Sequence, residues 1–142
     1  MMIRKGDLME TIEQNNIIDE LQALSSEVSI RHKSILDIMT KLDEYNARIN
    51  RAVAKSVTNC GCIEISAKKQ DFESDTLEEL AQKLDSHVRG NICNVCREKL
   101  EEEIGSYIFF LSSLAETLGF NLSDTIKKEL ERDRILGIYT MK

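Results

Sequence analysis

Apolar residues recur every three or four positions along most of the 142-residue chain. This spacing is typical of amphipathic helices that bury one face. Ser25 or Ser26 offers a cap where the first periodic stretch gives way to the second, and glycines mark two of the later stops. The pattern predicts helices over residues 7–24, 25–56, 75–90, 93–118 and 123–136.

Residues 57–73 interrupt the helical pattern. The short run "CIEIS" within them is too brief for an independent sheet and predicts a loop or a brief extended turn. Because the chain has no proline and only six glycines, its helices can run long. We therefore predict one all-α domain spanning 1–142, a four- to five-helix bundle with a cysteine-stapled loop between the second and third helices.

Composition excludes several classes of partner. A net charge of −6 disfavours binding to a phosphate backbone, and 5% aromatic residues without tryptophan disfavour a base-stacking platform, so no nucleic acid is expected. No apolar run approaches the length of a membrane span, and the first residues lack the apolar core of a secretion signal. A cytoplasmic protein with no membrane partner is the expectation.

All four cysteines of the chain fall in two close pairs, Cys60-x-Cys62 and Cys93-x-x-Cys96. Two such pairs are the usual layout of a four-thiolate zinc site, and a reducing cytoplasm disfavours disulfides. The second pair lies in the first turn of a predicted helix, where the helix dipole favours thiolates. We predict a structural zinc clamp around residues 57–96. Unmetallated buried or free thiols, an iron–sulfur site and a redox switch of Cys93 and Cys96 are the alternatives.

From "EEIGSYI" (102–108) to "LAETLGFNLSDTIKKEL" (114–130), the chain contains in order an acidic helix start, an apolar run, a glycine turn and a last helix. Together with "KLDEYNARI" (41–49), they resemble the MazG-like all-α nucleoside triphosphate pyrophosphohydrolases. The resemblance covers residues 35–56 and 97–134 and leaves the cysteine-bearing insert outside the family pattern. Matched position by position, it implies a catalytic set of Asp43, Glu44, Glu102, Glu103 and Ser106.

In this family the acids bind Mg²⁺ or Mn²⁺, and water attack releases a nucleoside monophosphate and pyrophosphate. The resemblance thus implies a nucleoside triphosphate as substrate and a homodimer or higher homo-oligomer. Two positions depart from the family pattern, since Ser106 and Ala47 stand where the family has carboxylates. Metal affinity should therefore fall unless another acid, such as Glu64 or Glu98, takes part.

Less specific interpretations compete with this one. The "EELAQ" run at 78–82 fits the first acidic motif almost equally well, and Asp43 and Glu44 are also ordinary candidates for surface charges. Glu103 is expected to face inward, because it shares the spacing of the apolar stripe. Lys68 and Lys69 are candidate phosphate contacts or a solvated loop pair. The alternative function is a non-catalytic zinc-stapled helical module that binds a protein partner or senses a nucleotide.

Overall fold

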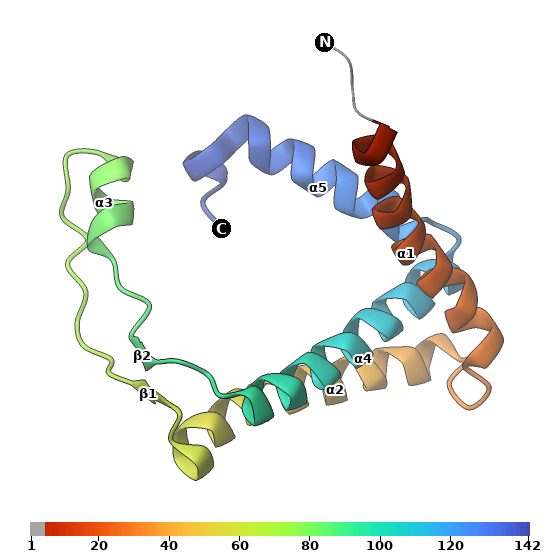
Figure 1. The fold of residues 1–142 in the computed structure, drawn as a ribbon, viewed down its shortest axis with the longest axis horizontal. Helices are drawn as coiled ribbons and strands as arrows, with labels where there is room; N and C mark the ends of the chain where they lie inside the picture. The colour runs from red at the N-terminus through yellow and green to blue at the C-terminus, as the bar shows by residue number, and fades with distance from the viewer. Residues whose placement is uncertain (1–4) are drawn as a thin grey trace.

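The computed structural model describes the backbone of residues 5–142 and the side chains of residues 17–142. The structure has four long helices (Figure 1). Between two of them, residues 61–93 form a thinner excursion that carries one short helix and a two-stranded sheet. The all-α class is confirmed, with the cysteines gathered where the excursion leaves and rejoins the helices. The helices are α1 (Lys5–Val28), α2 (Ile35–Lys55), α3 (Leu77–Lys83), α4 (Asn94–Leu118) and α5 (Leu122–Leu136).

Helices α2 and α4 form the centre of the molecule and run side by side in opposite directions (Figure 1). The buried apolar residues of this pair are Ile38 of α2 and Phe110 and Ala115 of α4. The ring of Tyr45 stacks on Phe110, with ring centroids 5.6 Å apart. Such stacking adds to the free energy gained by burying the rings. Phe110 is therefore a core residue.

The first helix is longer than the sequence predicts, and the predicted cap at Ser25 or Ser26 is wrong. Ser25 is buried inside α1, where its hydroxyl donates a hydrogen bond to the carbonyl of Gln22 at 2.7 Å. A serine bonded back to its own helix does not interrupt it. The cap of α2 is instead Ser34, whose side chain accepts from the Leu36 amide.

The predicted helix over 75–90 is also wrong beyond Lys83. Helix α3 begins at the cap Thr76 and ends after seven residues. The chain then forms strand β2 (Val88–Gly90), which pairs antiparallel with β1 (Ile63–Ile65). Gly90 has a φ of 84°, and a side chain there would lie 2.7 Å from the Cys62 carbonyl oxygen. This glycine thus permits the close approach of β2 to the start of β1 and does not stop a helix.

Gln22 of α1 fixes the turn between α4 and α5. Its side-chain amide donates to Glu116 at 2.9 Å and to the Phe120 carbonyl at 2.8 Å, and its oxygen accepts from the Leu122 amide at 2.8 Å. The residue is only 6% exposed. A buried amide that is fully hydrogen-bonded specifies the position of the groups around it.

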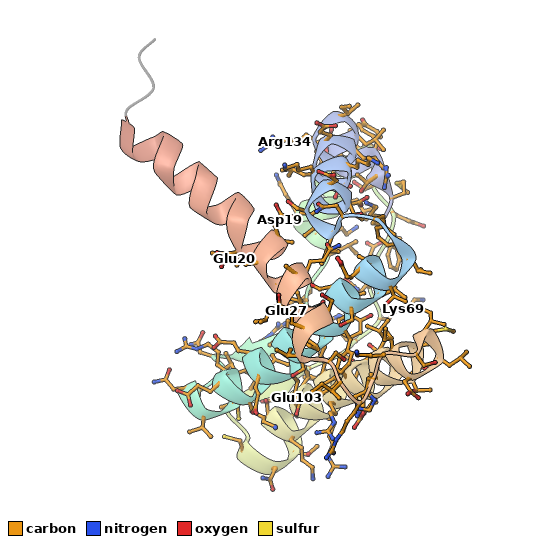
Figure 2. All side chains as sticks on the ribbon, turned by 90° about the vertical axis from the view of Figure 1, so that its right-hand side faces the viewer. Asp19, Glu20, Glu27, Lys69, Glu103 and Arg134 are labelled. Carbon is orange, nitrogen blue, oxygen red and sulfur yellow. The ribbon has the colours of Figure 1, made fainter. Side chains whose placement is uncertain are left out.

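The long helices diverge outside the central pair. Figure 2 shows α1 and α5 projecting from α2 and α4, with Glu103 labelled at the central pair. Many apolar side chains on these helices remain exposed. Among the described residues, no helix is both long enough and apolar enough to cross a bilayer.

Candidate metal centre

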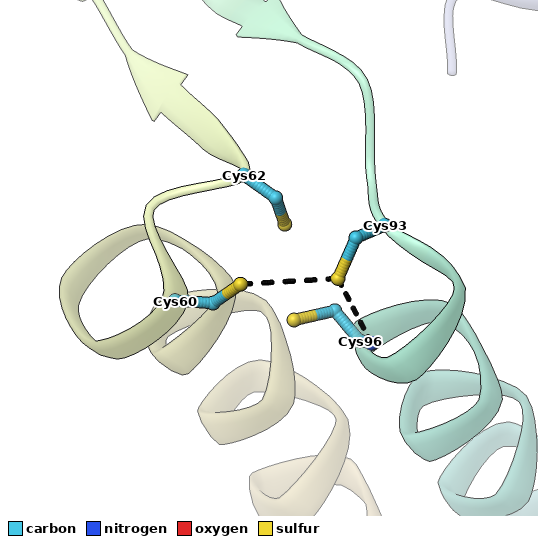
Figure 3. A group of neighbouring side chains, drawn as sticks. All are labelled: Cys60, Cys62, Cys93 and Cys96. Atoms are coloured by element: carbon cyan, nitrogen blue, oxygen red, sulfur yellow. Dashed lines mark hydrogen bonds between the residues drawn. The ribbon is translucent and has the colours of Figure 1, made fainter.

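Two chain segments that are distant in sequence deliver the four cysteines to one point. At the end of α2 the helix widens into a π-helical turn, Ser56–Cys60, which a left-handed Gly61 terminates. This reversal places Cys60 and Cys62 on either side of Gly61, just before β1. Cys93 is the cap residue of α4, and Cys96 lies in the first turn of that helix. Figure 3 shows all four sulfur atoms converging between the two segments.

The spacing of the sulfur atoms matches a tetrahedral metal site. All four Sγ atoms lie within 4.8 Å of one another, and Cys60 Sγ is 3.8 Å from Cys93 Sγ. A zinc ion with bonds of about 2.3 Å to four sulfurs separates those sulfurs by about 3.8 Å. A disulfide requires about 2.05 Å, and all four cysteines are free. The arrangement is therefore a possible four-cysteine metal site.

The local electrostatics of the sulfur cluster favour a bound cation. The backbone N–H of Cys96 donates a hydrogen bond to Cys93 Sγ at 3.4 Å. This bond, together with hydrogen bonds from the neighbouring thiols, lowers the pKa of Cys93 to about 7. The Ser56 contact lowers the pKa of Cys96, but the surrounding thiols, Cys93 first, raise it to about 12. Without a cation one thiolate can form easily, whereas further thiolates repel it. A divalent metal ion removes that conflict.

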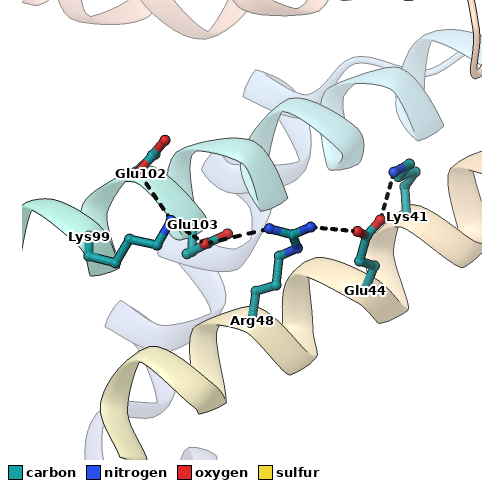
Figure 4. A network of polar contacts seen from close by, with 6 residues as sticks. All are labelled: Lys41, Glu44, Arg48, Lys99, Glu102 and Glu103. Atoms are coloured by element: carbon teal, nitrogen blue, oxygen red, sulfur yellow. Dashed lines mark hydrogen bonds and ion pairs between the residues drawn. The ribbon is translucent and has the colours of Figure 1, made fainter. Parts of the chain in front are cut away.

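Two of the predicted acidic residues, Glu44 and Glu103, belong to a second cluster along the same helix pair (Figure 4). Glu103 is only 4% exposed, and its carboxylate pairs with Lys99 Nζ at 2.9 Å and with Arg48 Nη1 at 3.9 Å. Arg48 Nη2 also binds Glu44 at 2.9 Å, and Lys41 binds the same carboxylate at 2.7 Å. A chain of alternating charges therefore joins α2 to α4.

The other predicted catalytic residues lie at the edge of this network or outside it. Glu102 is exposed and contacts only Lys99, at 3.3 Å, among the described side chains. Ser106 is half-buried one turn beyond Glu103, and Asp43 is exposed on α2. Lys68 and Lys69 are exposed in the excursion, where neither forms an ion pair with a described residue. The structure thus joins Glu44 to Glu103 through Arg48 and leaves Asp43 apart.

Sequence reasoning missed the basic residues that line this part of the helix pair. A cavity of about 620 Å³ lies between the end of α2 and the start of α4, beside the cysteines. Arg48, Arg51 and Lys55 face it from α2, and Lys99 faces it from α4. Their spacing of three and four residues along α2 was a readable signal, since it places them on one helix face.

No protein-family model, curated protein or solved structure matches this chain.

Proposed function

We propose that the four cysteines hold a zinc ion and that this ion joins the end of α2 to the start of α4. The observation that carries the proposal is the convergence of four sulfur atoms within 4.8 Å from two separate segments. Thiolate ligands in a tetrahedral array favour zinc among the common divalent metals. A reducing compartment such as the cytoplasm keeps the thiols available for it.

The role of this zinc is structural. Four protein ligands complete its coordination, so no position remains for a water or a substrate. The ion instead stabilises a region with little apolar core, since Ile38, Phe110 and Ala115 all lie on helix segments away from the cysteines. Metal binding of this kind contributes directly to the free energy of folding.

The experiment is a metal analysis of the purified chain together with cobalt substitution. We expect one zinc per chain, and intense thiolate-to-cobalt charge-transfer absorption after exchange. Charge-transfer absorption no stronger than that of two thiolate ligands would count against the proposal. A chain that folds fully without metal would also count against it.

A MazG-like pyrophosphohydrolase is the second candidate function. The observation in its favour is that Glu44 and Glu103 approach one guanidinium, that of Arg48, from facing helices. Carboxylates from facing helices are also how helical bundles hold divalent metals. Arg48 now neutralises both acids, so Mg²⁺ or Mn²⁺ binding requires its side chain to move away.

Pyrophosphate release from a panel of nucleoside triphosphates, with Mg²⁺ or Mn²⁺, tests this activity. Metal-dependent turnover that Glu103→Gln abolishes and that Glu101→Gln, an exposed residue of the same helix outside the predicted catalytic set, retains would support it. A folded, zinc-loaded chain without turnover would instead favour the non-catalytic helical module.

We also propose that the chain assembles with a second copy of itself. Its accessible surface is 11187 Å², whereas a compact monomer of its 16.2 kDa mass exposes about 7,500 Å². The excess exceeds the roughly 1,000–2,500 Å² that each partner buries in an obligate homodimer. Exposed apolar residues that a second copy would cover lie on all four long helices and include Ile17, Leu24, Leu36, Met39, Ile104, Ile108, Ile126 and Leu130.

Sedimentation equilibrium tests the assembly. We expect a mass at least twice that of one chain at micromolar concentration, and a thermal midpoint that rises with protein concentration. A folded monomer with a concentration-independent midpoint would contradict this proposal.

A further inference from the structure

The cavity beside the cysteines has an unusual charge for this protein. The chain carries a net charge of −6, yet the cavity lining contains four basic side chains and one carboxylate, that of Glu103. Glu103 already binds Lys99 and Arg48. Among the side chains that the structure describes, Arg51 and Lys55 have no carboxylate partner. The cavity thus holds two basic groups that are available to an anion.

The remaining walls of the cavity suit an organic group. Ala52 of α2 and Val95 of α4 line it together with the aliphatic stems of the basic residues. Val95 is 77% exposed at the start of α4, an exposure that a bound molecule would reduce. The volume of about 620 Å³ falls in the range of about 300–1,000 Å³ that small-molecule sites occupy.

We propose that this cavity binds an organic polyphosphate without a divalent metal ion. Arg51 and Lys55 contact the phosphate groups, and the organic part packs on Ala52 and Val95. Arginine suits this role because its planar donors match phosphate oxygens in pairs. The proposal rests on the zinc centre, since Cys60 and Cys96 form one wall of the cavity, but it does not require hydrolysis.

A competing explanation assigns the basic residues to the metal. Four thiolates around a zinc ion carry a net charge of −2, and nearby cations compensate such a charge. On that account, replacing Arg51 and Lys55 weakens zinc binding and leaves polyphosphate binding unchanged. Our proposal predicts the opposite pair of results.

Calorimetric titration of the zinc-loaded full chain with ATP and with inorganic tripolyphosphate, without added divalent metal, separates the two. We expect ATP to bind, and its affinity to fall at least tenfold in the double variant Arg51→Gln, Lys55→Gln with zinc content unchanged. Lys127→Gln, Lys128→Gln on α5 is the matched control and should bind like the original chain. Equal affinities in the two double variants, or no ATP binding, would overturn the proposal.

Two further comparisons fix the chemistry. Tighter binding of ATP than of tripolyphosphate supports the organic contact, whereas equal affinity overturns that part. The titration needs neither Mg²⁺ nor turnover, so its outcome is independent of the hydrolase assay. ATP binding in the titration, combined with no pyrophosphate release in the assay with Mg²⁺ or Mn²⁺, would contradict the hydrolase alone and support the cavity proposal.

Discussion

Cys60 and Cys93 lie 33 positions apart in the chain, yet their sulfur atoms approach to 3.8 Å. This contact joins the π-helical turn that follows α2 to the cap of α4, whereas the buried Phe110 lies in the second half of α4. Apolar packing therefore stabilises one end of the α2–α4 pair, and the four cysteines gather at the other.

If the four cysteines hold zinc as proposed, replacing Cys62 with serine should remove the ion and destabilise the fold. A serine hydroxyl is a poor ligand for zinc, and losing a structural metal is among the few changes that cost more than about 3 kcal/mol. Elemental analysis and thermal denaturation on the same sample measure both effects. Ser66→Ala, in the same excursion, is the control and should retain zinc. Zinc retained in Cys62→Ser would exclude this residue as a ligand.

Glu103→Gln should lower stability by about 1–2 kcal/mol, because it removes the charged acceptor of two basic side chains. The cost stays moderate since Lys99 and Arg48 are about half exposed, at 56% and 49% of their side-chain area, and can turn to solvent. Chemical denaturation measures the change. Glu102→Gln removes an exposed carboxylate beside the same Lys99 and should change stability by less than about 0.5 kcal/mol. Equal losses of stability in the two variants would contradict the buried network. Loss of zinc from Glu103→Gln would contradict the separation of this network from the cysteine centre.

The Asp85 carboxylate should titrate below its ordinary range. Hydrogen bonds from Arg89, and then from the His87 amide, hold the pKa of Asp85 below its usual 3.8. Since the pKa is lowered on folding, the contacts stabilise the turn above about pH 4 and are lost as the pH falls through the folded-state value. Carbon-13 NMR of the carboxyl group follows the titration. Arg89→Gln should bring the midpoint back towards 3.8, and an unchanged midpoint would exclude Arg89 as the main cause.

Gln22→Ala should release α5 from the rest of the molecule. The change removes one hydrogen bond to Glu116 at the end of α4 and two to the chain between Phe120 and Leu122, at a cost of about 2–3 kcal/mol. Amide hydrogen exchange should accelerate first across α5, because its remaining contacts are few. Gln82→Ala, on the exposed surface of α3, is the matched control. Uniform acceleration over α2 and α4 would show that Gln22 supports the whole fold.

Local chemistry explains which parts of the fold the sequence could predict. The start of α4 at the Cys93 cap and its stop at Gly119 follow from residues next to each other in the chain. The cysteine cluster was predictable as well, since only one kind of ligand occurs in two close pairs. By contrast, Gly90 resembles a helix stop, and only the nearby Cys62 carbonyl shows that it permits the close approach of two paired strands.

The basic neighbours of the acidic residues were hidden for the same reason. Glu103 carries the spacing of an inward-facing residue, which the structure confirms, but its partner Arg48 lies on another helix. Pairings between distant segments depend on how helices pack, and no local pattern encodes them. The acidic motif therefore shows where the carboxylates are, and it does not show that basic side chains already neutralise them.

The β1–β2 ribbon has a further consequence for the architecture of the chain. Ile65 pairs with Val88, so residues 66–87 leave and return at neighbouring points and carry α3 away from the central helices. In topological terms this arm is a self-contained insertion. We expect that a two-residue turn can replace it while the path from α2 through the cysteines to α4 keeps its geometry.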